Sequence, residues 1–82
     1  MKTIEERVIK CVEHALRVSE VHPDMTLDEL GADSLAKLEL VNELEDEFNI
    51  NIPTNYLARI TYVEDIIKLL YDWNEATIDN AD

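Results

Sequence analysis

The sequence has few of the residues that make turns and crosslinks. Its 82 residues include one glycine, two prolines and one cysteine. Scarcity of glycine and proline favours long regular elements over many tight turns, and a single cysteine cannot form a disulfide within the chain. No apolar run approaches the roughly 20 residues that cross a bilayer, and no stretch alternates polar with β-branched or aromatic residues. We therefore expect an all-α domain.

Positive charge is also scarce. Seven Lys and Arg residues against 19 Asp and Glu residues give a net charge of −12. Nucleic acid is a poor partner for such a surface, because phosphate binding needs Lys and Arg. We expect partner proteins with basic patches, whose encounters with this chain electrostatic steering would speed. The alternative interpretation is that the charge only keeps the protein soluble.

The length suits one domain with a thin core, since a domain of this size buries only about 60% of the surface that its unfolded chain exposes. A roomy enzyme cleft would be hard to build around such a core. Residues 1–6 lack the apolar stretch of a signal peptide. We expect a cytoplasmic protein without membrane insertion, with an organelle-targeted precursor that has lost its leader as the alternative.

Apolar residues recur at helical spacing in three segments. The first opens with a capping box at Thr3 and Glu6 and runs to about Val18. The second starts near Asp33 and Ser34 and is ended by Asn49, Asn51 and Pro53. A capping box at 61–64 opens the last, which runs to about residue 73. The expected apolar stripe of the second helix is Leu35, Leu38, Val41, Leu44 and Phe48, widened by Leu40.

Between these segments we expect a long loop over 19–33 and a short third helix capped by Thr54. The fold expected is a small four-helix bundle formed by residues 1–73. Residues 74–82 are polar, acidic and without periodicity, and we expect a disordered tail there. The only glycine, Gly31, falls at the end of the long loop, where it would supply a backbone shape that other residues resist.

Residues often used in catalysis or metal binding do not cluster. Cys11 falls on the apolar stripe of the first helix, which indicates a small buried hydrophobe rather than a reactive thiol. His14 and His22 lack a set of Cys or carboxylate side chains at ligand spacing, so we expect no metal site.

The string Gly31-Ala32-Asp33-Ser34-Leu35 places a hydroxyl at the start of the second helix. Helix starts have unpaired N–H groups and a positive dipole end, so a phosphodiester on Ser34 would be stabilised there. Asp33 could cap the helix or hold a divalent cation during modification. On spacing alone, the simpler interpretation is that Asp33 and Ser34 are ordinary helix caps.

The string also resembles the attachment motif of acyl carrier proteins, the phosphopantetheine-binding carrier domains. The resemblance covers roughly residues 3 to 73. It continues, in order and spacing, through Leu40-Val41, the stretch Leu-Glu-Asp-Glu-Phe at 44–48, Ile52-Pro53, and Arg59-Ile60-Thr61 with Val63. The motif together with the acidic helix and the Ile-Pro hinge is far more specific than the motif alone.

The resemblance implies a carrier that catalyses nothing itself. A phosphopantetheinyl transferase, with magnesium, would attach 4′-phosphopantetheine from coenzyme A to Ser34, with Asp33 in a supporting role. The thiol of that arm would carry acyl groups as thioesters in fatty acid, related lipid or polyketide biosynthesis. The partners implied are the transferase and acyl-loading, acyl-transfer or condensing enzymes with basic patches, and a shuttle of this kind would work as a monomer.

The resemblance also suggests which residues contact partners. Glu39, Glu45 and Asp46 match positions where the family meets basic patches, and exposed ion pairs worth only about 0–1 kcal/mol each would let a shuttle release its partners. We add three positions near the arm or in the family pattern to these expected contacts: Lys37, Asn42 and Arg59.

Departures from the family point to a specialised carrier. Ala36 stands where many fatty-acid carriers have an acidic residue, Lys37 adds a positive charge near the arm, and Asn42 replaces a frequent Met. Leu57 and Ile66 replace residues that are often Ala, and could fill the cavity that holds long acyl chains in relatives. We therefore expect a modified partner set or a shorter cargo.

Three alternatives remain open from the sequence. The first is an aminoacyl or peptidyl carrier, which would use the same serine. The second is an unmodified acidic adaptor that kept the fold. The third, a hydrolase with Ser34 as nucleophile, lacks the Gly-x-Ser-x-Gly turn and a base placed by the sequence.

Overall fold

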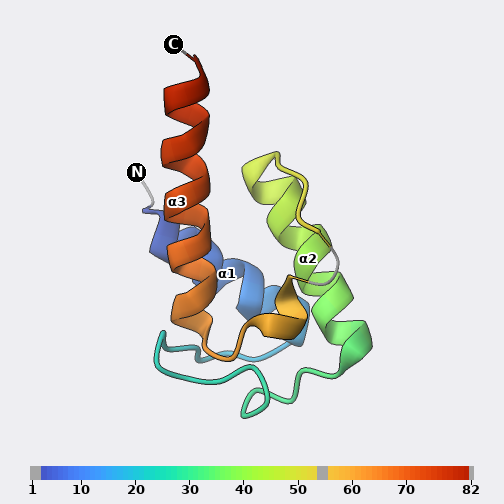
Figure 1. The fold of residues 1–82 in the computed structure, drawn as a ribbon. Helices are drawn as coiled ribbons and strands as arrows, with labels where there is room; N and C mark the ends of the chain where they lie inside the picture. Colours follow the sequence, from blue (N-terminus) through green and yellow to red (C-terminus); the bar gives the residue numbers. More distant parts are fainter. Residues whose placement is uncertain (1–2, 54–55, 82) are drawn as a thin grey trace.

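The computed structural model describes residues 3–53 and 56–81, with side chains as far as residue 73. Its elements are α1 (Ile4–Leu16), α2 (Ser34–Phe48), the 3-10 helix η1 (Leu57–Arg59) and α3 (Val63–Ala81), as Figure 1 shows. Over the described residues the only β pairing is an isolated bridge between Thr26 and Tyr62. The expected all-helical class is confirmed.

The expected four-helix bundle is not confirmed, because the described residues form three α-helices and have η1 in place of the short third helix. No side chain caps η1, and it ends after one turn where Ile60 turns extended and its N–H bonds to the Leu57 carbonyl oxygen. Thr54, the expected cap of that helix, lies outside the described residues.

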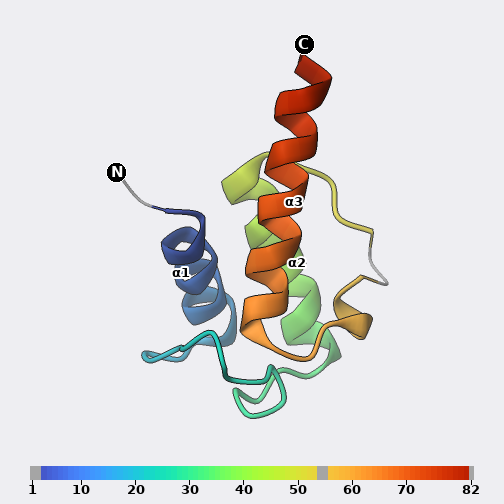
Figure 2. The same cartoon turned by 60° about the vertical axis from the view of Figure 1, so that its left-hand side comes forward.

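Helix α1 packs against both α2 and α3, and Figures 1 and 2 show the three helices from two sides. The long loop from α1 to α2 crosses one end of the bundle (Figures 1 and 2), and η1 lies beside α2. Apolar residues from all four elements and from the loops meet in one core. Its fully buried large side chains are Val8, Val12, Leu27, Leu40, Leu44, Leu57, Val63 and Ile66.

The ends of α1 and α2 follow local capping rules. Thr3 and Glu6 form the predicted capping box, with the Glu6 N–H donating to Thr3 Oγ1 over 3.1 Å. Arg17 and Asn49 adopt left-handed backbone at φ 57° and 56°, and each N–H returns to a carbonyl of the last turn. Helix α1 therefore ends at Leu16, before the expected Val18, whereas α2 ends ahead of Asn49 as predicted.

The start of α3 differs from the sequence-based expectation, because carbonyl groups of the long loop accept hydrogen bonds from the first backbone N–H groups of the helix. The N–H groups of Val63 and Glu64 donate to the carbonyl oxygens of Met25 and Pro23, each over 2.9 Å. The expected box at 61–64 is therefore wrong. Asp65 instead accepts the Tyr62 N–H over 3.0 Å, one residue further along. These bonds fasten the loop to α3.

The C-terminal segment also differs from the expectation of a disordered tail over 74–82. The backbone of α3 is helical as far as Ala81 and extends beyond the other helices (Figures 1 and 2). Residues 74–81 contain neither Gly nor Pro, so no residue in this stretch forces the helix to stop. No described helix is long and apolar enough to span a membrane.

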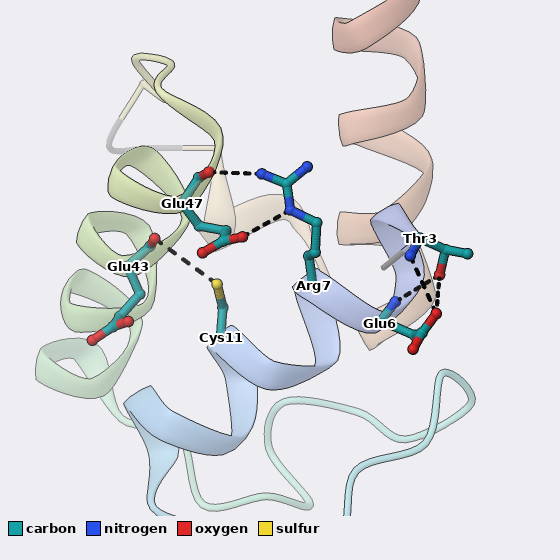
Figure 3. Close-up of polar contacts among 6 residues, drawn as sticks. All are labelled: Thr3, Glu6, Arg7, Cys11, Glu43 and Glu47. Carbon is teal, nitrogen blue, oxygen red and sulfur yellow. Dashed lines mark hydrogen bonds and ion pairs between the residues drawn. The ribbon is translucent and has the colours of Figure 1, made fainter. Parts of the chain in front are cut away.

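A line of polar contacts joins α1 to α2 (Figure 3). Arg7 Nε lies 2.7 Å from Glu47 Oε2, and Arg7 Nη2 donates to the Glu47 carbonyl oxygen over 2.8 Å. The same guanidinium sits 4.3 Å from the centre of the Phe48 ring. One turn on, Cys11 Sγ lies 3.9 Å from the Glu43 carbonyl oxygen, and His14 Nδ1 lies 2.7 Å from Glu43 Oε1.

Because one guanidinium makes three contacts, replacing Arg7 with Ala should lower the free energy of unfolding by about 1–2 kcal/mol, the sum of a partly exposed ion pair and a cation–π contact. Lys10→Ala removes an exposed cation from the same helix and should change it by less than about 0.5 kcal/mol. Urea denaturation of both variants measures the two changes in the free energy of unfolding. Equal changes would show that the Arg7 contacts contribute nothing to stability.

Candidate functional site

The site begins with the cap of α2. Asp33 has extended backbone, and its Oδ1 accepts the Ala36 N–H over 2.8 Å. Its carbonyl oxygen accepts the Lys37 N–H over 3.0 Å. Asp33 is therefore the N-cap, and Ser34 is the first residue of the helix, exposed and with a hydroxyl that makes no hydrogen bond to any described residue. The simpler interpretation from spacing holds for Asp33 but not for Ser34, whose hydroxyl has no capping role.

Hydrogen bonds and a buried side chain fix the loop before α2, so that the helix begins at Ser34. Thr26 and Glu29 exchange hydrogen bonds, and the Thr26 backbone N–H and hydroxyl keep the pKa of the Glu29 carboxyl below its usual range. Leu27 is buried and its carbonyl oxygen accepts the Ala32 N–H over 3.1 Å. Gly31 has φ 80°, so the predicted need for glycine there is confirmed.

An open groove of about 270 Å³ starts at Ser34 and runs between α2 and η1. Four of its lining residues come from α2 and two from η1. They are Ser34, Lys37, Leu38, Val41, Leu57 and Ala58. The groove is partly apolar and has the Ser34 hydroxyl at its edge, so a group attached to Ser34 would have a surface to lie against.

The expected apolar stripe of α2 is wrong at its first two positions. The side chains of Leu35 and Leu38 are 64% and 49% exposed. The helix buries Leu40, Val41 and Leu44, which were all expected on its apolar side. At 100° per residue, Leu35 lies about 170° from the mean direction of these three side chains, so it cannot face the core with them. Both leucines therefore give the surface beside Ser34 an apolar character.

The expected partner contacts lie on two neighbouring elements, α2 and η1, but differ in their surroundings. Glu39, Asn42, Asp46 and Arg59 are exposed, whereas Lys37 is half-buried. Glu45 is also half-buried, and its Oε2 accepts the Ile52 N–H over 2.7 Å. Sequence reasoning missed this loop-anchoring contact, because it joins residues that the helical pattern does not relate, and also missed Ala58 at the groove.

Other groups contribute little to a chemical site. A polar hollow of about 520 Å³ between α1 and α2 is lined by residues such as Glu13, Arg17 and Glu39, but it does not include Ser34. Burial raises the pKa of the Cys11 thiol to about 11, with help from the Glu47 and Glu43 charges. Within the described residues, no three His, Cys, Asp or Glu side chains are grouped to hold a metal ion.

A comparison with protein families identifies the family of the chain. The family model described as "Phosphopantetheine attachment site" matches residues 6–70, most of the 82-residue chain. The chain belongs to this family. Its members are carrier proteins that bear 4′-phosphopantetheine covalently on a serine and work with phosphopantetheinyl transferases and partner enzymes.

The residues of this phosphopantetheine carrier fit such an arm at the start of α2. The backbone N–H groups of Ser34 and Leu35 donate to no described residue, so they are available to a phosphate oxygen. The exposed Ser34 hydroxyl leaves room for the bond to phosphorus, and the groove leaves room for the apolar part of the arm. When bound, the arm would supply a thiol that forms thioesters.

The cap at Asp33 can be tested apart from its charge. Asp33→Ala removes the acceptor of the Ala36 N–H and should lower the free energy of unfolding by about 1 kcal/mol, with faster amide exchange in the first turn of α2. Asp33→Asn keeps an acceptor oxygen and removes the charge, so it should cost a few tenths of a kcal/mol. Equal losses in the two variants would assign the effect to charge and contradict the capping role.

Proposed function

We propose that Ser34 bears the 4′-phosphopantetheine arm and that the protein is a non-catalytic acyl carrier. The supporting observation is the position of Ser34 as the uncapped first residue of α2, exposed and at the edge of the groove. The only other serine, Ser19, lies in the loop after α1, away from any helix start. Ser34 alone combines a free hydroxyl with free N–H groups that stabilise a phosphate.

In the modification step the Ser34 oxygen forms a bond to the phosphorus that carries the pantetheine half of coenzyme A. The pyrophosphate bond of coenzyme A breaks, and its adenine-nucleotide half leaves with the other phosphates. The hydroxyl proton passes to a base of the transferase, with magnesium offsetting the phosphate charge. Asp33 supports the step by fixing the helix start through its bond to the Ala36 N–H.

The acidic surface of α2 supports partner enzymes with basic patches. Glu39 and Asp46 are exposed on the helix that starts at Ser34, and Arg59 is exposed on η1 beside the groove. Together with the net charge of −12 and the Leu-Glu-Asp-Glu-Phe stretch, this favours acyl over aminoacyl or peptidyl cargo. We place the protein in fatty acid or related lipid or polyketide biosynthesis, in the cytoplasm, as a monomer.

We also propose a short acyl cargo, so that this carrier is specialised. Leu57 and Ile66 are 2% and 0% exposed, and both belong to the core behind the groove. A long chain entering the bundle would have to displace them, and forcing extra methylene groups into a packed core typically costs about 1–3 kcal/mol. A short chain can lie in the groove without disturbing the core.

Attachment is tested by intact-protein mass after incubation with coenzyme A, magnesium and a broad-specificity transferase. The wild type and the matched control Ser19→Ala should each gain one phosphopantetheine, and Ser34→Ala should gain none. A folded wild type without any gain would favour the unmodified adaptor. Transfer of amino acids but not acyl groups onto the arm would favour the aminoacyl carrier.

Cargo length is tested by amide NMR of butanoyl-loaded and hexadecanoyl-loaded protein. Neither chain should shift the Ile66 amide by more than the bare arm does, because Ile66 lies in the closed core and does not line the groove. The double variant Leu57→Ala, Ile66→Ala opens space, so the longer chain should then shift neighbouring core amides. A large shift at Ile66 in the wild type with the longer chain would contradict the short-cargo proposal.

A further inference from the structure

Lys37 is the only cation of α2, and it stands at the groove that begins at Ser34. We propose that Lys37 is a positioning residue: its ammonium group pairs with the phosphodiester of the arm and holds the root of the arm over the groove. This inference rests on the proposed attachment to Ser34. It adds a role in the carrier alone, with no partner enzyme bound.

The position of Lys37 on the helix makes the contact possible. Residues three apart on a helix are neighbours on its surface, so the side chains of Ser34 and Lys37 lie on one face. Lys37 points within about 15° of the mean direction of Leu40, Val41 and Leu44. Its stem is accordingly half-buried, and the flexible amine at its end can stay in solvent.

The electrostatics favour the phosphodiester over other partners for this amine. Among the described residues, Lys37 has no ion pair, whereas Arg7 and His14 each pair with a carboxylate of α2. The carboxylate nearest in sequence, Asp33, has one oxygen engaged by the Ala36 N–H. The remaining acidic residues of α2 begin at Glu39 and are concentrated toward its C-terminal end. A new negative charge at Ser34 would therefore meet one unpaired cation.

The consequence is a bias in the direction of the arm. An arm free at its root samples all directions from the end of the helix, whereas an arm paired with Lys37 starts over Leu38, Val41 and Ala58. The pair is exposed, so it would hold the arm weakly and salt would weaken it further. A weak hold suits a group that partner enzymes must take up and release.

The test compares apo and arm-bearing protein for the wild type, Lys37→Gln, Lys37→Arg and Lys68→Gln, with mass spectrometry confirming attachment in each. Lys68→Gln is the matched control, because it removes an exposed cation from α3. Urea denaturation at low salt gives the ratio of the folding equilibrium constants of arm-bearing and apo protein. The wild-type ratio should exceed that of Lys37→Gln by about two- to fivefold.

Lys37→Arg and Lys68→Gln should keep the wild-type ratio, and about 1 M salt should remove the difference. Arm attachment should also shift the Ala58 amide in wild type more than in Lys37→Gln. Equal ratios and equal Ala58 shifts in wild type and Lys37→Gln, with the arm attached in both, would overturn the inference and leave the attachment intact. Failure of the wild type to take the arm would overturn the proposed function, and the inference with it.

Discussion

The hydrogen bond from the Ala36 N–H to Asp33 Oδ1 decides where α2 begins, and the rest of the site depends on that choice. Because Asp33 takes the capping role, Ser34 becomes a helical residue whose hydroxyl is free. Its backbone N–H and that of Leu35 face no protein acceptor among the described residues. A cap one residue later would have engaged the serine itself. The Asp33 side chain thus caps the helix, and the Ser34 hydroxyl is left free for chemistry.

Contacts on the other elements keep this helix start in place. Arg7 and His14 fasten α1 to the C-terminal half of α2 through Glu47 and Glu43, while the first half of α2 keeps its polar groups free. The long loop is fastened to α3 by the bonds from Val63 and Glu64. The core between these contacts is closed by residues such as Leu57. The polar contacts that join the helices and the long loop therefore lie away from Ser34, which stays exposed.

Sequence reasoning succeeded where structure is set by neighbours along the chain. The capping box at Thr3, the left-handed turn at Gly31 and the end of α2 before Asn49 all follow from local geometry. It failed where contacts between distant segments of the chain determine the structure. The Glu64 N–H bonds to the carbonyl oxygen of Pro23, far along the chain, and periodicity could not tell that Leu35 and Leu38 lie outside the buried face of α2.

The same limit applies to the site. The attachment motif was visible as a string of residues, and the exposure of Ser34 follows from its place at a helix start. The groove depends on how η1 packs beside α2, which no pattern within α2 specifies. Likewise, Leu35 and Leu38 looked like core residues because their spacing is helical, although they lie beyond the face that α1 covers.

The central claim is that Ser34 carries the arm, and peptide-level fragmentation mass spectrometry tests it most directly. Protein produced together with a phosphopantetheinyl transferase is digested, and the mass of 4′-phosphopantetheine is located along the fragments. The account predicts the added mass at Ser34 and none at Ser19. An arm on any other residue, or no arm on folded protein that an active transferase has treated, would contradict it.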